Sequence, residues 1–578
     1  MRPVDRGPAR PRPTSRPRRE PTRPLPPIRL RVIGILLVLV LAFVGIGVRL
    51  FDLQARDRSH LVSLGVGQRV RTVTIPAERG NIFDRSGKVF AVSVPQTTIV
   101  ADPRVIKDPV GYAAKLAPIV QLDAAALVQR LSNHQSAFAY VARKVNDDVA
   151  NRVRKLGLVG LSYQDESRRF YPNGSVAGPL VGFVGTDNTG LGGMEYHYDK
   201  LLTGAPGRVQ VERDPQGNDI PGGQRQVTPA KRGQDLVLTL DSSLQWNTEQ
   251  ALVKGVTDMN AKGGTAVIVD VQTGDILAMA TVDGATADRP AQAAGATESN
   301  RPVTDVYEPG STNKVITMSG AIQEGLVTPQ TVVENVYQSI NVGGTDYTDV
   351  EDHASTMTVA DILAQSSNVG TIRIAGGLGK DRLAHYLDAF GFGHSTGLGL
   401  PGESSGITLP LSQYNDTSMG SIPIGYGIAV TAMQMLDVYT TIANHGIARP
   451  PRLVAGTVDA AGKRHDAALV APHAVVSATT ADAVTSMLKK VVSEGTGVKA
   501  QIPGYPVAGK TGTARKAPYD TGEYNASFAG FAPADNPRLA AIVVVDSPEG
   551  SIFGADAAAP VFQQIMRFAL TYERVPTS

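Results

Sequence analysis

The stretch EPGSTNK, residues 308–314, is followed directly by the apolar, helix-forming run VITM. The Pro-Gly pair breaks the chain, so a helix is expected to begin close to Ser311. Side chains three residues apart share one face of a helix, which lets Lys314 reach the Ser311 hydroxyl. The first turn also offers unpaired backbone N–H groups and a partial positive charge. A serine beside an amine in this setting has the parts of an acyl-transfer nucleophile.

A second Ser-x-x-Lys occurs at residues 486–489, but no chain breaker precedes it and it fits one face of an amphipathic helix. Ser311 differs from it because two further motifs, Ser366-Ser367-Asn368 and then Lys510-Thr511-Gly512-Thr513, come later in the chain. Taken singly, Ser-x-Asn is usually a turn or a cap, and Lys-Thr-Gly is usually a strand end. The three motifs in this order form the signature of the penicillin-recognising serine acyltransferases.

The composition excludes several classes of protein. A chain of 578 residues with 42% hydrophobic and 19% charged residues is globular and long enough for two or three domains. The net charge of +3 gives no reason to expect nucleic-acid binding. Cysteine is absent, so disulfides, thiol nucleophiles and Cys-based metal sites are excluded. The nine His lack metal-ligand spacing, and we predict no metal and no cofactor.

The N-terminal part of the chain predicts a membrane anchor. Residues 1–31 hold ten Arg among many Pro and are expected to form a disordered cytoplasmic tail. Residues 32–48 are uncharged and apolar, which is enough for a short transmembrane helix of about 25 Å. A cleavable signal peptide is the alternative, but no small-residue cleavage site comes after the run. The excess of Arg before the span places the N-terminus in the cytoplasm and the rest of the chain outside the cell membrane.

Residues 49–230 predict a less regular region. Its many Gly and charged pairs suggest turns held by salt bridges, and it is interpreted as a scaffold and not as a second active site. Residues 215–233 are polar and are typical of a linker or an exposed hairpin. The elements expected here are strands at 70–76 and 89–94 and helices at 110–131 and 146–155.

Residues 231–578 predict an α+β domain. Continuous apolar runs indicate a sheet covered on both faces. Strands near both ends of this segment, with helical sequence between them, predict one antiparallel sheet with inserted helices. The expected strands are 234–241, 264–270, 275–280, 506–513, 526–531 and 539–546, and helices are expected from 242 and at 560–572.

From the membrane span to the C-terminus, the chain resembles the class B penicillin-binding proteins, the monofunctional peptidoglycan D,D-transpeptidases. The segment RGNIFDR, residues 79–85, and the Gly185 to Glu195 segment are similar to the pedestal signatures of that family. SNVG at 367–370 and SFAGFAP at 527–533 are more similar to the cell-division (septal) branch than to the elongation branch. The resemblance implies an elongated pedestal domain of the dimerisation type at 49–230. It also implies a serine β-lactamase-like transpeptidase domain at 231–578.

The resemblance also assigns chemical roles. Ser311 would attack the D-Ala–D-Ala carbonyl of a stem peptide and form an acyl-enzyme, with Lys314 as general base. An ordinary Lys is protonated at neutral pH, so the site must lower that pKa by burial and by a second cation such as Lys510. Ser366 would relay the proton to the leaving amine. Asn368 would hold Lys314 and the substrate amide.

The strand with the Lys-Thr-Gly motif is expected to bind the rest of the substrate. Lys510, Thr511, Gly512 and Thr513 would line the cleft and bind the substrate carboxylate. The backbone N–H groups of Ser311 and Thr513 would form the oxyanion hole.

The partners implied are peptidoglycan stem peptides, β-lactams, the membrane, a polytopic glycan polymerase and other division proteins. A β-lactamase on the same fold is a rival function, but Glu403 and Glu494 lie in turn contexts unlike those of the deacylating Glu. The sequence also leaves open a β-lactam sensor, a non-catalytic scaffold and an elongation-type transpeptidase.

Overall fold

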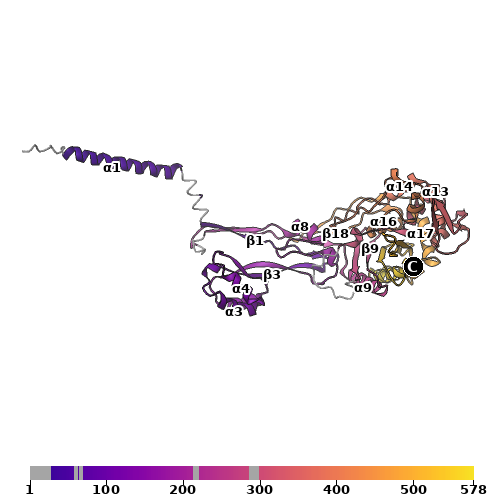
Figure 1. The fold of residues 1–578 in the computed structure, drawn as a ribbon, viewed down its shortest axis with the longest axis horizontal. Coiled ribbons are helices and arrows are strands. Elements are labelled where there is room, and N and C mark those ends of the chain that lie inside the picture. The colour runs from indigo at the N-terminus through magenta and orange to yellow at the C-terminus, as the bar shows by residue number, and fades with distance from the viewer. Residues whose placement is uncertain (1–27, 57–62, 64–68, 213–219, 285–298, 578) are drawn as a thin grey trace, which may run out of the picture. The chain divides into compact units, whose positions relative to one another are not determined.

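The computed structural model describes residues 28–56, 63, 69–212, 220–284 and 299–577 (Figure 1). These residues form two compact units. The first unit takes the described residues up to Thr74 together with 208–228. The second takes 75–207 and the described residues from 229 onward. Each unit is described by itself.

The first unit contains a long apolar helix and a small sheet. Helix α1 (Ile28–Phe51) leads into the short π-helical segment Asp52–Arg56. The span from Ile28 to Ala55 reaches a mean hydropathy of 2.7, and it is the one helix in the described residues long and apolar enough to cross a membrane. The helix contains the predicted run 32–48 and extends it at both ends, while residues 1–27 of the predicted tail lie outside the described residues.

The sheet of this unit has the order β1-β6-β7. Its strands are β1 (Val70–Ile75), β6 (Gly207–Glu212) and β7 (Arg225–Thr228). Strand β7 pairs antiparallel with β6 and has exposed side chains, so its residues confirm the exposed-hairpin interpretation. Residues 215–219 of that predicted segment lie outside the described residues.

The N-terminal part of the second unit is built on a long strand, β3 (Val89–Ala101). It pairs with β2 (Ile82–Phe83), β4 (Ala139–Val145) and β5 (Leu161–Phe170). The predicted helical stretch 110–131 is two helices, because Gln121 takes a left-handed conformation and Asp123 caps the second helix. The helices are α3 (Pro109–Val120), α4 (Ala124–Leu131), α5 (Asp147–Arg154), α6 (Gly178–Val181), α7 (Gly193–His197) and α8 (Asp199–Thr203).

A buried ion network holds the turns of this region. Arg79 Nε lies 2.7 Å from Glu195 Oε2, and Arg169 Nε lies 2.6 Å from Glu195 Oε1. Arg79 also pairs with Asp199 at 2.7 Å. Glu195 is fully buried, so it needs both guanidinium groups as partners. The expectation of turns held by salt bridges is confirmed.

The strand at 234–241 was expected in the antiparallel sheet of residues 231–578, and this expectation is wrong, because the strand pairs instead with β2 of the N-terminal region. β8 (Asp235–Leu238) runs parallel to β2 and antiparallel to β18 (Val454–Val458). The sheet order is β19-β18-β8-β2-β3-β4, with β5 also paired to β3. One continuous sheet therefore combines strands from residues 82–170 with strands from 235–466.

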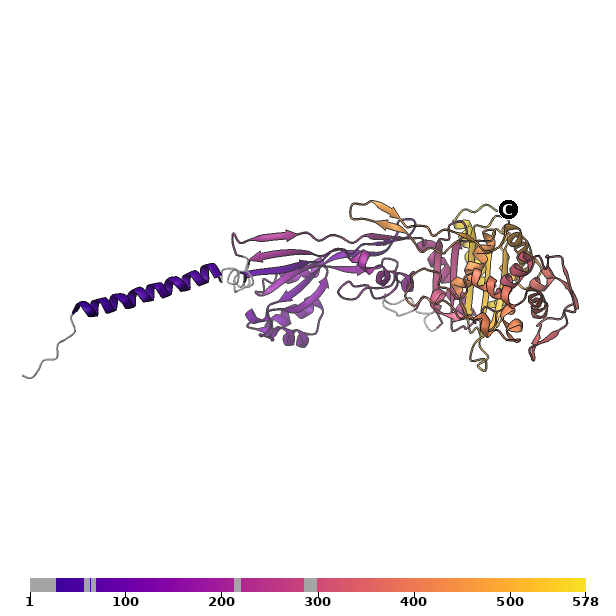
Figure 2. The ribbon, with the colours of Figure 1, turned by 90° about the horizontal axis from the view of Figure 1, so that it is seen from above.

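The second sheet is five-stranded and antiparallel, in the order β10-β9-β23-β22-β21. In Figure 2, magenta strands from the start of the segment 231–578 lie beside yellow strands from its C-terminal end. Every residue of β9 is buried, as its continuous apolar sequence predicts. Ala266 and Ile268 share a core with helices α9 and α19, and Val267 and Val269 share another with α16. The elements are β9 (Gly263–Asp270), β10 (Ile276–Asp283), β21 (Ala508–Arg515), β22 (Tyr524–Ala532), β23 (Leu539–Asp546), α9 (Ser242–Asp258), α16 (Ala432–Ala443) and α19 (Ala559–Tyr572).

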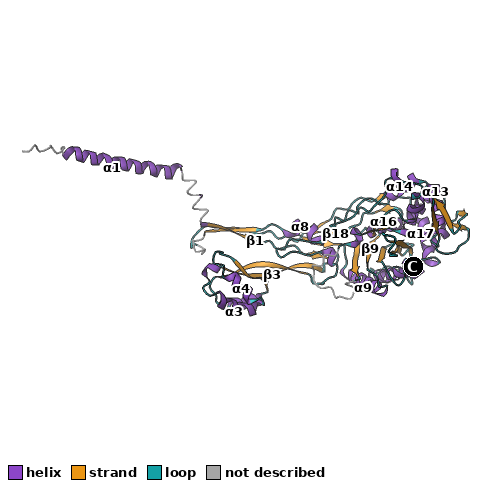
Figure 3. Ribbon diagram, in the orientation of Figure 1, coloured by secondary structure: helices purple, strands orange, loops and turns teal. Residues whose placement is uncertain are grey.

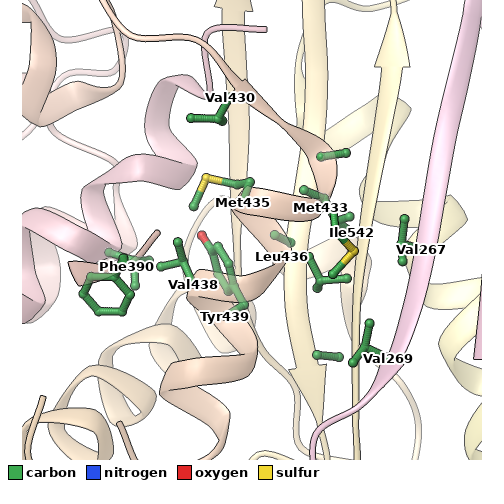
Figure 4. Close-up of a cluster of buried hydrophobic side chains, with 14 of the residues drawn as sticks. Val267, Val269, Phe390, Val430, Met433, Met435, Leu436, Val438, Tyr439 and Ile542 are labelled. Carbon is green, nitrogen blue, oxygen red and sulfur yellow. The ribbon is translucent and has the colours of Figure 1, made fainter. Parts of the chain in front are cut away.

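Helix α16 covers the sheet face on which the site is built. Figure 4 shows Met433 and Leu436 of this helix close to Val267 and Ile542 of the sheet. Side chains of successive strand residues point to opposite faces, so one strand contributes to both cores.

The helices of the middle segment are inserted between β10 and β21, and the α+β class is confirmed (Figure 3). The longer inserted helices are α11 (Lys314–Gln323), α12 (Val359–Ala364), α13 (Asn368–Leu378), α14 (Lys380–Ala389) and α17 (Ala478–Ser493). The remaining elements are α10 (Arg301–Thr304), β11 (Val306–Tyr307), β12 (Val332–Glu334), β13 (Ser339–Val342), β14 (Thr345–Thr348), β15 (Thr356–Thr358), α15 (Ser418–Ser421), β16 (Val430–Thr431), β17 (Ile447–Ala448), β19 (Arg464–Asp466), β20 (His473–Ala474) and α18 (Gly554–Ala557).

Candidate active site

Ser311 lies in the first turn of a helical segment that begins directly after the Pro-Gly pair. A 3-10 turn spans Gly310–Asn313 and continues as α11 from Lys314. Gly310 has a φ of 55°, and a Cβ at this position would lie 2.9 Å from the Thr513 carbonyl oxygen. Only glycine satisfies both conditions. The expected helix start is confirmed, and it places the loop beside strand β21.

Lys314 connects the Ser-x-x-Lys and Ser-x-Asn motifs. Its Nζ donates to the Ser366 carbonyl oxygen at 2.5 Å and to Asn368 Oδ1 at 2.8 Å. It lies 3.3 Å from Ser366 Oγ, which in turn donates to Ser311 Oγ at 2.9 Å. Ser366 has a φ of 61°, a rare conformation for a serine and one that is often found at functional sites. The hydroxyl of Ser366 therefore bridges the nucleophile and the amine.

Asp349 supports this arrangement, although no motif in the sequence points to it. Its carboxylate accepts hydrogen bonds from Ser367 Oγ at 2.6 Å and from the backbone N–H groups of Asn368 and Val369. His353 Nε2 contacts the same carboxylate at 2.7 Å. These N–H groups open helix α13, where an acid is favourable. Asp349 lies among several other acidic residues of one loop, so sequence alone gave no signal for it.

Strand β21 carries Lys510, whose amine is fully buried. Its Nζ donates to the carbonyl oxygen and to the hydroxyl of Thr511, both at 3.2 Å, and lies 3.4 Å from Thr496 Oγ1. Thr496 also contacts Thr511 Oγ1 at 2.8 Å. Thr496, in the turn after α17, is a second site residue that no sequence motif singles out. The Lys510 amine thus lies behind a pair of threonine hydroxyls.

Gly512 and Thr513 bring β21 close to the nucleophile loop. A Cβ on Gly512 would lie 2.4 Å from Ser527 Oγ and 2.9 Å from the Pro309 carbonyl oxygen. The Thr513 carbonyl oxygen lies near Gly310 and accepts from Tyr426 Oη at 3.4 Å. In an extended strand, the N–H and C=O of one residue point to the same side. The Thr513 N–H therefore also points away from β22, toward the Ser311 loop.

Burial lowers the pKa of Lys314 from its ordinary 10.5 to about 7, although the nearby Asp349 acts in the opposite direction. Burial and the charge of Lys314 together hold the pKa of Lys510 well below its ordinary value. The expectation that burial lowers the pKa of Lys314 is confirmed, whereas Lys510 is not among the causes that act on Lys314. The effect runs the other way, because the Lys314 charge lowers the pKa of Lys510. An amine with a pKa near neutrality can accept a proton at physiological pH.

Ser486, of the second Ser-x-x-Lys, and Glu308, which precedes the Pro-Gly pair, lie outside this cluster. Ser486 is exposed on α17, and Lys489 pairs with Asp535, as expected for a solvated helix face. Glu308 accepts from the Gly427 N–H at 2.8 Å and from Tyr519 Oη at 3.0 Å, and burial raises its pKa. Within the described ranges, no group of three His, Asp or Glu side chains could hold a metal ion.

A serine bridged by a second hydroxyl to a buried lysine, on a five-stranded antiparallel sheet with helices on both faces, is the arrangement expected of a serine acyltransferase of the penicillin-binding type. The family model "Penicillin binding protein transpeptidase domain" matches residues 264–567, and "Penicillin-binding Protein dimerisation domain" matches 74–238. The chain belongs to the class B penicillin-binding proteins, the monofunctional peptidoglycan D,D-transpeptidases.

Individual relatives agree over nearly the whole chain. The peptidoglycan D,D-transpeptidase FtsI of Escherichia coli is 36% identical over 541 residues, which cover 92% of this chain and 89% of the relative. PbpB of Mycobacterium tuberculosis is 35% identical over 582 residues, which cover 94% of this chain and 85% of the relative. The structure of penicillin binding protein 3 from Mycobacterium tuberculosis complexed with aztreonam is similar with a TM-score of 0.68 and 30% identity, covering 88% of this chain and 98% of the other.

Proposed function

We propose that this enzyme crosslinks peptidoglycan stem peptides through an acyl-enzyme on Ser311 and releases the terminal D-Ala. The observation that carries the proposal is the contact path from Ser311 Oγ to Ser366 Oγ, 2.9 Å, and on to Lys314 Nζ, 3.3 Å. With a pKa of about 7, about half of the Lys314 amines are neutral near pH 7 and can take the serine proton.

In the first half-reaction, Ser311 Oγ attacks the carbonyl carbon of the D-Ala–D-Ala bond, and its proton passes to Lys314. Ser366 then returns this proton to the departing D-Ala amine, which leaves a serine ester. In the second half-reaction, an acceptor amine of a neighbouring strand attacks the ester and Ser311 regains its proton. Asn368 supports both steps, because its Oδ1 fixes the Lys314 amine at 2.8 Å.

The N–H groups of Ser311 and Thr513 are proposed to stabilise the oxyanion. The Thr513 carbonyl oxygen points away from β22, toward Tyr426 and Gly310. The N–H of a strand residue points to the same side as its carbonyl, so the Thr513 N–H points toward the Ser311 loop, which supports this role. The substrate carboxylate is assigned to Thr511 and Thr513, with the Lys510 amine behind them. Gly512 contributes by its lack of a side chain, which lets β21 lie against Pro309.

β-Lactams are expected to acylate the same serine. A relative of 30% identity has been solved in complex with aztreonam, which supports this proposal. The test is the intact mass of the protein after brief penicillin exposure, beside a Ser311→Ala variant. We expect a persistent adduct of one drug mass that is absent from the variant. An adduct on both proteins, or on neither, would contradict the assignment of Ser311.

Slow deacylation separates this proposal from the β-lactamase function. Glu403 accepts from Thr396 Oγ1 and from the N–H groups of Gly397 and Gly399, so it is engaged in holding its own turn. The Glu494 carboxylate is 69% exposed. These two positions favour a long-lived acyl-enzyme. If the adduct disappeared within seconds, the hydrolase would be the better interpretation.

We further propose a septal role. The support is the similarity of residues 367–370 and 527–533 to the division branch of the family. Depletion of the protein from its host is expected to yield filaments with unfinished septa. Cells that instead lose their shape while continuing to divide would indicate the elongation branch.

We propose a single uncleaved span with the N-terminus in the cytoplasm and the catalytic unit outside. The Arg-rich residues 1–31 before α1 support this orientation through the positive-inside rule. Protease added outside spheroplasts should digest the catalytic unit and spare an N-terminal tag. The reverse pattern would contradict the orientation.

The partner proposed for the span is a polytopic glycan polymerase, alongside other division proteins. Co-purification of the polymerase should survive Ser311→Ala and be lost when residues 32–48 are exchanged for an unrelated apolar span. Loss of the complex in Ser311→Ala, or its survival with the unrelated span, would contradict this partner assignment.

A further inference from the structure

A second cavity lies in the N-terminal part of the second unit, and it shares no lining residue with the site at Ser311. Its volume is about 630 Å³, within the range of ligand pockets of about 300–1,000 Å³. It is formed by the end of β4, the end of β5 and the loop at 183–188. Four of its lining residues are basic, namely Arg143, Lys144, Arg168 and Arg169.

A bulge in β4 turns two consecutive basic residues into this cavity. The pairing of β3 with β4 shifts between Thr97 and Ile99, and Lys144 has a φ of 52°. The Lys144 N–H donates to Thr98 Oγ1 at 3.0 Å and not to a ladder partner. Neighbouring residues of a regular strand point to opposite faces, so the bulge is what lets Arg143 and Lys144 line the same cavity.

Two of the cations lack a carboxylate partner among the described residues. Lys144 Nζ donates to the neutral side chain of Asn188 at 2.7 Å. The Arg168 side chain is exposed and forms no hydrogen bond or ion pair with any described residue. Arg143, in contrast, pairs with Glu166 at 2.9 Å and Asp187 at 2.8 Å. The cavity therefore retains an excess of positive charge.

A buried guanidinium adds a fixed donor. The Arg169 side chain is only 2% exposed, and its Nε and Nη1 are satisfied by Glu195, by the Gly80 carbonyl oxygen and by Ser93 Oγ. Its Nη2 has no acceptor among the described residues. Buried polar groups are nearly always hydrogen-bonded, so an N–H of this kind beside a cavity favours an acceptor that enters it.

Aromatic side chains form the other part of the wall. Phe170, Tyr171 and Phe183 line the cavity, and Phe170 is 52% exposed. An exposed phenylalanine beside free cations matches a ligand that combines an apolar portion with a negative charge.

We propose that this cavity is a second ligand site, which binds the oxyanion of a carboxylate- or phosphate-bearing small molecule through Lys144, Arg168 and Arg169. The apolar portion of the ligand packs against Phe170 and Phe183. A guanidinium group binds the oxygens of a carboxylate and those of a phosphate through the same kind of paired N–H···O bonds. Because the same contacts serve both groups, experiment distinguishes them.

The test is calorimetric titration of the full-length protein in a non-ionic detergent with inorganic pyrophosphate and, separately, with citrate. We expect saturable binding of at least one probe and about a tenfold or greater loss of affinity in Lys144→Gln/Arg168→Gln, which removes two charge-assisted contacts. The stronger probe identifies the ligand as a phosphate or a carboxylate.

Lys107→Gln/Lys115→Gln is the matched control, because both lysines are exposed in the same region and their loss changes the net charge equally. This control should bind like the unmodified protein. If the double cavity variant fails to fold, Arg168→Gln alone replaces it, since this exposed side chain has no partner among the described residues. Absence of saturable binding to both probes, or an equal loss in cavity and control variants, would overturn the proposal.

Discussion

At the scale of single residues, Lys314 shows how burial changes the chemistry of a common side chain. The Lys314 amine is removed from water and held by a carbonyl oxygen, a hydroxyl and an amide oxygen, with no carboxylate of a described residue in contact. Burial disfavours the charged form, and the pKa falls to about 7. The amine is therefore a base at the pH at which an unburied lysine is an acid.

This pKa predicts the pH dependence of acylation. The second-order rate constant for penicillin acylation should fall about tenfold per pH unit as the pH drops below about 7, because protonated Lys314 cannot accept the serine proton. Above that pH the rate constant should level off. The measurement is adduct formation over time across a series of buffers from about pH 5 to about pH 8.

Two variants control this experiment. Lys314→Arg should lose acylation at every pH in the series, because a guanidinium does not give up its proton. Ser486→Ala removes the exposed serine of the second Ser-x-x-Lys and should leave the profile unchanged. A rate constant that does not vary across the series would refute Lys314 as the base.

Asp349 supplies a second prediction at the residue scale. Asp349→Ala removes the acceptor shared by Ser367 Oγ and the first N–H groups of α13, and leaves them unpaired. We expect a loss of about 3 kcal/mol in the free energy of unfolding and about a tenfold or greater loss in acylation rate. Urea unfolding and adduct kinetics measure the two effects.

Asp352 is a matched control for this change, because it is an exposed acid of the same loop. Asp352→Ala should alter neither property. Equal behaviour of the two variants would show that Asp349 has no special role in positioning Ser366 and Asn368.

At the scale of elements, very short helices are held by a buried ion network in addition to the hydrophobic core. Helices α6, α7 and α8 have four or five residues each, too few to be stable alone. Glu195 of α7 binds Arg79 and Arg169, which lie before β2 and at the end of β5. One buried carboxylate thus connects three segments.

Glu195→Gln should therefore destabilise the protein strongly, by about 3–5 kcal/mol, because it leaves the buried Arg169 guanidinium without a counter-charge and leaves Arg79 with Asp199 alone. The urea midpoint followed by circular dichroism measures this change. Asp466→Asn, which breaks the exposed pair of Asp466 with Arg464, should leave the midpoint unchanged. A small effect of Glu195→Gln would mean that the network is not needed for stability.

At the scale of the whole molecule, α1 makes the protein a membrane protein. Its 24 residues extend about 36 Å at 1.5 Å per residue, which exceeds the roughly 30 Å hydrocarbon core of a bilayer. All its described side chains are exposed to the surroundings, and most are apolar. Such a surface is stable only in lipid or against another protein.

Deletion of residues 28–51 should release the protein from membranes into an alkaline carbonate wash, while the complete chain stays in the pellet. A chain in which the order of residues 28–51 is shuffled keeps the same hydropathy and should also stay in the pellet. Release of the complete chain, or retention of the deletion variant, would contradict a membrane span.

Much of the site was predictable because its motifs are local. The Pro-Gly break predicts where a helix begins, and three-residue spacing places Lys314 near Ser311. Apolar runs predicted the strands of the five-stranded sheet, and their burial is a consequence of the same property. Asp349 and Thr496 were not predictable, because the motif residues that they contact, Asn368 and Thr511, are more than a dozen residues away and many polar residues of loops look alike.

The sequence by itself determined the class of fold and the apolar N-terminal helix, and it singled out Ser311 and Lys314 as candidates for the site. These depend on composition, periodicity and short spacings, which the chain carries without folding. Only the tertiary structure decided that β8 joins the sheet of residues 82–170, that burial brings the Lys314 pKa to about 7, and that a bulge turns Lys144 into a second cavity. Those properties depend on which distant segments pack together and remove which groups from water, and this is determined only when the chain folds.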